Sequence, residues 1–199
     1  SRGLGDVYKR QNLELVETLR EKQKRGSLLW VLDKTKTAMG ARLLRSYVEQ
    51  PLIDKAEIEK RQDAICELNQ HVITREELRE YLNPIYDLER LITRVTYLTA
   101  NPRDLIAFRS SIAMLPPIKS LLGDFHGELL GEIREDMDTL EELCALIDRA
   151  IMEEPPISVR DGGLIKDGYN EDVDKYRKAK TEGKTLSLIH ISEPTRPRL

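Results

Sequence analysis

Residues that commonly carry out chemistry are scattered through this 199-residue sequence and share no catalytic or metal-binding spacing. His71 and His126 each lack a second ligand at helical spacing, so we expect both to be solvent-exposed or to cap a helix. Cys66 and Cys144 form no CxxC or Cys/His pattern. We therefore expect them to be buried small hydrophobes rather than a disulfide or part of a metal site.

The motifs of the common catalytic and cofactor sites are also missing from the sequence. The chain contains no GxxxxGKS/T phosphate-binding loop and no GxSxG, HExxH or GxGxxG motif. We predict that this chain has no catalytic, cofactor-binding or metal-binding residue and that it is not an enzyme by itself.

Two acidic segments could be mistaken for metal sites. Asp161, Gly162 and Gly163 precede Asp167 and Asn170, but their spacing does not match the DxDxDG calcium loop, so a structural turn is favoured. The second segment is expected to lie on exposed helix positions and at a helix N-terminus, where carboxylates contribute to capping and solubility. Its members are Glu132, Glu135, Asp136, Asp138, Glu141 and Glu142.

The charge distribution argues against a broad DNA-binding surface. The formal net charge is −3, and because residues 1–11 and 184–199 each contribute +2, the middle of the chain carries −7. DNA affinity depends mainly on clustered lysine and arginine. Trp30 and Tyr47 are expected to be core aromatics, since no basic groove accompanies them. One basic cluster lies among glutamates and is predicted to be a solvated helix face. It comprises Arg20, Lys22, Lys24 and Arg25.

Composition and periodicity predict a mainly α fold. Hydrophobic residues make up 40% of the chain and charged residues 34%, which suits a soluble helical protein, and no run of about 18 apolar residues could cross a membrane. Capping residues and prolines bound the segments of helical periodicity. The predicted helices run from Thr37 to Glu49, from Asp54 through Val72, from Thr74 to Pro84, from Leu88 to Leu98, from Asn101 to Leu115, from Thr139 to Ile151, and onward from Asn170.

The apolar stripes of these helices are expected to face the core. They include Leu43 and Tyr47; Ile58, Ile65, Leu68 and Val72; Leu88, Leu91, Ile92, Val95 and Leu98; Leu105, Phe108 and Ile112; and Leu143, Cys144, Ile147 and Ile151.

Glycine and proline mark the predicted breaks between helices. Pro116 and Pro117 are expected to end one helix, and a looser stretch rich in glycine follows them. Residues 157–166 are predicted to form at most a small β-hairpin, or a tight turn, around Asp161-Gly162-Gly163.

The two ends do not fit the helical pattern. Residues 1–11 and 184–199 lack caps and periodicity, and both are similar to translated linker sequence at the ends of assembled reads. We therefore expect residues 12–183 to form the domain and both ends to be linker or assembly artefacts.

Several sequence blocks resemble the core (lever) domain of the MutS family of DNA mismatch-repair proteins. The resemblance begins near Asn12 and runs to about Lys180. Its blocks are Asn12–Leu15, Ser27–Thr35, Thr37–Arg45, Glu49–Leu52, Asp87–Leu91, Asn101–Leu105, Val159–Gly163 and Gly168–Asn170.

The resemblance implies a fragment of a dimeric ATPase that recognises mispaired or looped-out bases. It implies a helical core connecting the mismatch-binding and clamp regions to the ATPase domain, with those other regions lying outside this chain. For the intact protein it implies ATP and magnesium as cofactors, and as partners mismatched double-stranded DNA, a second MutS subunit and downstream repair proteins. The expected location is the bacterial cytoplasm, associated with the nucleoid when on DNA, with no membrane partner.

Two alternatives remain at this stage. Composition alone fits a free-standing helical adaptor that binds other proteins. A downstream Walker A motif would distinguish a MutS fragment from such an adaptor. A MutS relative not devoted to mismatch repair is the third hypothesis, which an upstream Phe-x-Glu motif would exclude.

Overall fold

A computed structural model describes residues 13–192 of the chain, with side chains from residue 13 to residue 184. The fold is mainly α, as predicted from the sequence. Residues 1–11 and 193–199 lie outside the described part, whereas residues 184–192 continue the last helix of the chain; the assignment of both ends as linker stays a prediction. The elements are α2 (Leu28–Leu32), α3 (Ala38–Glu49), α4 (Lys55–Gln70), α5 (Val72–Leu82), α6 (Leu88–Thr96), α7 (Pro102–Ile112), α8 (Leu115–Leu122), α9 (Glu128–Asp136), α10 (Glu141–Ala150), the 3-10 helix η1 (Val159–Asp161) and α11 (Glu171–Ser192).

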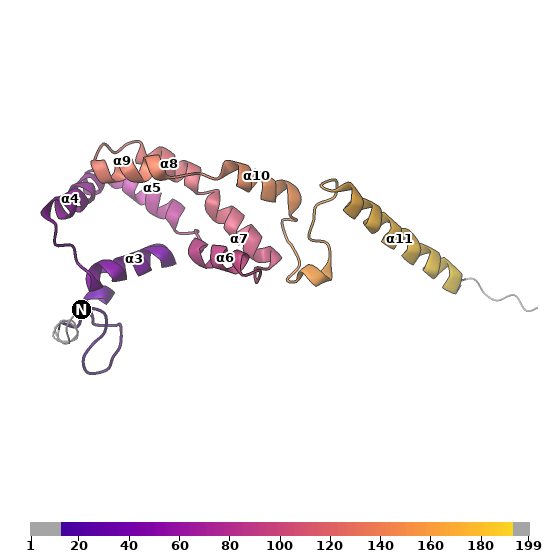
Figure 1. Ribbon diagram of the computed structural model, residues 1–199, viewed down its shortest axis with the longest axis horizontal. Coiled ribbons are helices and arrows are strands. Elements are labelled where there is room, and N and C mark those ends of the chain that lie inside the picture. Colours follow the sequence, from indigo (N-terminus) through magenta and orange to yellow (C-terminus); the bar gives the residue numbers. More distant parts are fainter. Residues whose placement is uncertain (1–12, 193–199) are drawn as a thin grey trace, which may run out of the picture.

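The helices form an elongated molecule (Figure 1). Helices α4, α5, α8 and α9 pack together at one end, α6 and α10 pack on α7 in the middle, and α11 projects from the other end. Helix α3 lies beneath the first group and contacts α2. The chain therefore has a packed body with a long helix extending away from it.

Two separate apolar clusters hold the body together. The larger lies among α4, α5, α8 and α9, and the smaller lies between α7 and the end of α10. Each cluster is small, so many apolar side chains elsewhere in the chain stay exposed. The larger cluster buries Ala64, Leu78, Ile85, Ile118, Leu122, Phe125 and Leu130, and the smaller buries Ile147, Ala150 and Ile151.

Several predicted helix starts are confirmed by hydrogen bonds. The Thr37 and Asp54 side chains accept from the backbone N–H groups of Gly40 and Glu57. At the start of α7, Asn101 and Asp104 form a reciprocal capping box, with Pro102 at the first helical position. Short polar side chains thus satisfy amide groups that have no partner inside the helix.

Two other predicted starts are wrong. Helix α5 begins at Val72, before Thr74, and the Thr74 hydroxyl donates instead to Asp124 of a distant segment. Helix α10 has no side-chain cap, because its N-cap is Leu140, which carries no acceptor and adopts a left-handed conformation with φ of 51°. The chain turns there from α9 into α10, so the turn overrides the local capping signal of Thr139.

The glycine-rich stretch after residue 115 is not loose, contrary to the prediction. Pro116 and Pro117 lie in the first turn of α8, where a missing amide hydrogen costs nothing, and so they begin a helix rather than end one. Gly127 is the N-cap of α9, and its N–H and that of His126 donate to the Glu67 carboxylate of α4. A Cβ at Gly127 would lie 2.7 Å from Glu67 Oε2, so a larger residue here would displace that carboxylate from its hydrogen bonds.

The predicted hairpin within residues 157–166 does not form. Residues Val159–Asp161 make a 3-10 turn, closed by a capping box between Ser158 and Asp161. Among the described residues, β pairing is limited to one antiparallel bridge between Ile151 and Ile165. Ile165 therefore pairs with the end of α10 rather than with its own neighbours, and the tight-turn alternative is correct.

The inward faces were predicted only in part. Leu91, Ile112, Ile147 and Ile151 are buried. The prediction is wrong for eight residues whose side chains are more than a third exposed: Leu43, Tyr47, Ile65, Val72, Ile92, Val95, Leu98 and Leu143. Periodicity identifies the apolar side of a helix, but this body contains too few neighbouring elements to cover every such side.

The most apolar stretch of described helix is Pro102–Leu122, with a mean hydropathy of 1.3. It is long and apolar enough, by length and composition alone, to cross a membrane. However, it contains two helices, α7 and α8, and its Ile112, Ile118 and Leu122 are buried in the protein. One such stretch is weak evidence for a membrane span, because helices of soluble proteins pass the same test.

Replacing Ile112 with alanine should destabilise the body strongly. Ile112 is 1% exposed, and large-to-small substitutions at such positions cost about 2–5 kcal/mol. Ile53→Ala is the matched control, because Ile53 is 95% exposed and its replacement should be near neutral. Urea unfolding followed by circular dichroism measures both, and equal midpoints for the two variants would contradict the assigned core.

Candidate functional site

Three segments that are distant in sequence meet at a junction of α3, α6 and α7. Arg42 on α3 forms a fork with Asp87, with its Nη1 2.6 Å from Oδ2 and its Nη2 2.8 Å from Oδ1. The Arg42 Nη2 atom also lies 2.5 Å from Glu89 Oε2. Such two-pronged pairing fixes the orientation of both groups, which a single contact between flexible chains does not.

Asp87 serves α6 as well as α3. It is the N-cap of α6, where its Oδ1 accepts from the backbone N–H of Arg90 at 3.2 Å. Hydrogen bonding to Arg42, followed by that to the Arg90 amide, holds the pKa of Asp87 below its ordinary value of 3.8. One carboxylate therefore starts α6 and joins it to α3.

The start of α7 is joined to α6 in a similar way. Arg94 Nη1 on α6 lies 3.0 Å from Oδ1 of Asp104, the residue that completes the capping box of α7. The hydroxyl of Ser111, a fully buried residue on α7, accepts from the backbone N–H of Tyr86 at 2.9 Å. Both ends of α6 are thus fixed to α7.

An open cleft of about 460 Å³ lies between α6 and α7. Leu91 and Ala107 provide its apolar surface, and the remaining lining is polar. We call it the α6–α7 cleft; its lining residues are Tyr86, Asp87, Arg90, Leu91, Arg94, Asn101, Arg103, Asp104 and Ala107. It offers hydrogen-bond donors but no nucleophile beside a base, so its chemistry is binding rather than catalysis.

The histidines and cysteines do not gather into a site. His71 lies between α4 and α5 as a cap, its Nδ1 3.0 Å from the Glu67 carbonyl oxygen, as expected of a capping histidine. His126 is exposed, as also expected. Cys66 is exposed and Cys144 is half-buried, so the prediction that both cysteines are buried is wrong. Within residues 13–184, no three His, Cys, Asp or Glu side chains are grouped to hold a metal ion.

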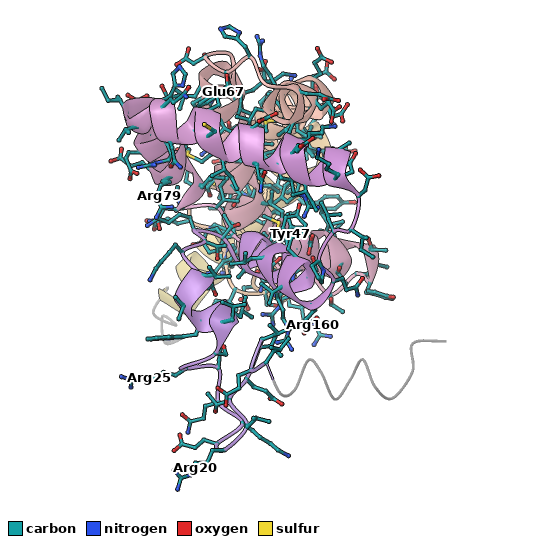
Figure 2. The ribbon with its side chains drawn as sticks, turned by 90° about the vertical axis from the view of Figure 1, so that its left-hand side faces the viewer. Arg20, Arg25, Tyr47, Glu67, Arg79 and Arg160 are labelled. Carbon is teal, nitrogen blue, oxygen red and sulfur yellow. The ribbon has the colours of Figure 1, made fainter. Side chains whose placement is uncertain are left out.

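The residues considered for nucleic-acid binding are also separate. Trp30 and Tyr47 are 47% and 39% exposed, so the core prediction is wrong; Arg61 packs over the Tyr47 ring at 3.7 Å. The cluster from Arg20 to Arg25 lies on an exposed loop rather than on a helix face. Figure 2 shows Arg20 and Arg25 on this loop, far from Glu67.

The loop residues considered for calcium are engaged within the chain. Asp161 accepts from the Ser158 amide, Asp167 pairs with Arg177, and Asn170 caps α11 through the amides of Asp172 and Val173. These bonds make the segment a connection into α11, in agreement with the predicted turn and the predicted cap. The acidic stretch from Glu132 to Glu142 is exposed, as expected, and Glu132 pairs with Lys60 of α4.

Sequence reasoning did not predict the junction itself. In the sequence, Arg42, Asp87 and Asp104 are only members of three separate blocks. The sequence contains no signal for their pairing beyond the opposite charges of Arg42 and Asp87. Their pairing depends on how α3 folds back onto α6, which no local pattern specifies.

Comparison with known proteins identifies the family of the chain. A family model described as MutS domain III matches residues 10–193. The chain belongs to the MutS domain III family. The match covers all the helices of the junction, so the Arg42–Asp87 and Arg94–Asp104 contacts lie within this MutS domain.

Individual relatives agree with the family assignment. The protein named DNA mismatch repair protein MutS from Lachnoclostridium phytofermentans is 67% identical over 179 residues, which is 90% of this chain and 19% of that protein. Proteins of the same name from Acetivibrio thermocellus and Staphylococcus carnosus are 46% and 48% identical over 97% and 96% of the chain, and over 22% of their own length. The chain spans about a fifth of the length of these relatives.

Three carboxylates, one of them at the junction, should make stability sensitive to acid. Asp87, Glu67 and Asp33 all have lowered folded-state pKa values, that of Asp33 falling to about 2 beside Lys24. A depressed pKa contributes stability that is complete above the unfolded value of about 4 and is lost as pH falls through the folded value. The free energy of unfolding should therefore be flat from about pH 7 to 5 and fall below about pH 4.

The variant Asp87→Asn tests the part that belongs to the junction. It cannot titrate, so its unfolding free energy should fall less steeply below about pH 4 than that of the unchanged protein. Urea titrations at a series of pH values give both curves. Parallel curves would show that the Arg42–Asp87 pair does not contribute to the acid response.

Proposed function

We propose that this chain is a connecting scaffold in a MutS-type mismatch-repair protein, linking the mismatch-binding and clamp regions to an ATPase domain. The observation that carries the proposal is the junction, where paired charges fix α3, α6 and α7 to one another within a MutS domain III. Rigid elements joined by charge networks can transmit a change between distant sites.

The shape of the molecule supports this role. Helix α11 has 22 residues and projects from the packed body (Figure 1). Its residues 171–183, which lie within the predicted domain, span roughly 20 Å at about 1.5 Å per residue. Arg177 on α11 donates to the Ile165 carbonyl oxygen and pairs with Asp167, so the base of the helix is held by the segment that pairs with α10. Movement of the body would therefore be carried outward along α11.

The proposal extends to the longer protein. Its cofactors would be ATP and magnesium, bound outside this chain, and its partners mismatched double-stranded DNA, a second MutS subunit and downstream repair proteins. It would act in the cytoplasm and on the nucleoid. The support is the name DNA mismatch repair protein MutS, which the compared bacterial relatives carry.

The two alternative hypotheses are not favoured. A free-standing adaptor does not account for relatives that are about five times as long as the chain and match nearly all of it. A MutS relative with another task does not account for 67% identity to a protein named for mismatch repair.

A chimera tests the scaffold role. Residues 13–184 of this chain replace the matching region of the Lachnoclostridium phytofermentans relative, and ATP turnover is measured with matched and G·T-containing duplex. We expect the chimera to hydrolyse ATP and to respond to the mismatch as the parent does. The chain alone should do neither, because it lacks the sequence motifs for both; turnover that stays with the purified chain, or a preference of the chain for G·T duplex, would contradict the proposal.

Charge reversal at Arg42 tests the role of the junction in the same experiment. Arg42→Glu places three carboxylates together, so the chimera should keep its DNA-free ATP turnover while the response to G·T duplex falls. Arg45→Glu is the matched control, since Arg45 lies on the same helix and pairs only with Glu49 of that helix. An unchanged mismatch response in Arg42→Glu would overturn the role of the junction.

A further inference from the structure

The helices of the body fall into two groups, each with its own packing. The main helix–helix packing of the described chain joins α4, α5, α8 and α9 in a first group, and joins α6 and α10 to α7 in a second. Each group surrounds its own apolar cluster. Of the described residues of α6, α7 and α10, only Leu88, the first of α6, packs on the larger cluster. Each group is therefore a unit, and the connections between the two decide whether the body can bend.

The chain passes between the two groups at three short connections, which together we call the neck: residues 83–87, 113–114 and 137–140. Figure 1 shows the two groups following each other along the long axis of the molecule. Two hydrogen bonds hold the connections to neighbouring helices. The Tyr86 amide donates to the hydroxyl of the buried Ser111 on α7, and Lys119 Nζ on α8 donates to the Met137 carbonyl oxygen at 2.6 Å. Bending between the groups would therefore occur at the neck.

Two of the connections have irregular backbone. Between α7 and α8, Pro116 and Pro117 have no amide hydrogen, so the carbonyl groups four residues before them receive no helical hydrogen bond. The Met114 amide donates to a carbonyl group only three residues back. Such breaks are the usual causes of helix kinks. Between α9 and α10, Leu140 has a φ of 51°, and strained residues of this kind cluster in segments that switch conformation.

Helix α3 contacts both groups across the neck. On the first group, its Met39 packs against the larger cluster, and the Arg61 guanidinium of α4 lies 3.7 Å from the centre of its Tyr47 ring. On the second group, its Arg42 forms the fork with Asp87 at the start of α6. Because α3 has no buried residue, these surface contacts hold it in place. A helix attached on both sides of a neck limits bending there.

We propose that the chain bends at the neck and that α3 is a releasable brace, which holds the two groups in one relative orientation. With α3 in place, the groups move as a unit. When Arg42 parts from Asp87, the second group swings relative to the first and carries α11 with it. Hinges are commonly a few residues at the ends of elements, and a two-state element is what coupling between distant sites requires. The hinge and the brace are properties of this chain alone, whereas their use in coupling rests on the proposed function.

Distances between two spin labels test the hinge in the complete 199-residue chain. Cys66, which is exposed on α4, carries one nitroxide, and Ala145→Cys, at an exposed position of α10, carries the other. Cys144→Ser removes the remaining thiol. Pulsed electron paramagnetic resonance then gives the distribution of distances across the neck. Cys66 with Glu135→Cys of α9 is the matched control pair, because both positions lie in the first group.

Arg42→Gln should release the brace. Loss of a two-pronged charged hydrogen bond should raise the population of the bent state by about tenfold, so the pair across the neck gains a second distance. The control pair should keep its single distance. Arg61→Gln, which removes the contact on the first group, should act in the same direction. Arg45→Gln removes only a pair within α3 and should change neither distribution.

Two outcomes would overturn the brace. An unchanged distance across the neck in Arg42→Gln would mean that α3 does not restrain the groups. Equal broadening of the control pair would mean that the first group itself loosens. A further substitution tests the position of the hinge: in the Arg42→Gln background, Pro116→Ala with Pro117→Ala restores two amide donors and should reduce the bent population. No reduction would contradict a hinge at the α7–α8 connection.

The chimera described above separates the two proposals. If Arg42→Gln opens the neck of the chain but the chimera that carries it responds normally to G·T duplex, the hinge is supported and the scaffold role of the junction is contradicted. If the neck stays closed while the response to G·T duplex falls, the brace is contradicted and the scaffold role is supported.

Discussion

The contact between Arg42 and Asp87 is the constraint on which the arrangement of the first half of the molecule depends. Asp87 satisfies an amide at the start of α6 and two guanidinium nitrogens from α3 at once. Helix α3 contains no buried residue, so apolar burial alone does not fix its position. Met39 touches the larger core and Tyr47 stacks under Arg61, but only Arg42 joins α3 to α6 by charge.

Much of the fold could be predicted from the sequence because its signals are local. Thr37, Asp54, Asn101 and Asn170 each cap a helix at the expected position, since a short polar side chain needs only its own next turn to do so. The fold class likewise follows from helical periodicity. The family was already evident from ordered blocks along the chain.

What could not be predicted depends on distant segments. Glu67 stabilises the start of α9 from α4, so the glycines near it suggested a loop where the structure has a helix. Ile165 pairs with Ile151 rather than within a hairpin. The prediction that the apolar faces of α3 and α6 are buried is wrong for the same reason. An apolar stripe does not show whether another element of the chain covers it. The junction of Arg42, Asp87 and Arg94 is likewise a property of the assembled helices.

Hydrogen exchange of the α3 amides tests the central claim most directly, that the Arg42–Asp87 contact holds α3 on the body. The account predicts that Arg42→Gln speeds exchange throughout Ala38–Glu49 while α5 and α8, held by the larger core, exchange as before. Arg45→Gln, which removes only a pair within α3, should leave the exchange pattern of the body unchanged. Unaltered protection of α3 in Arg42→Gln would contradict the account.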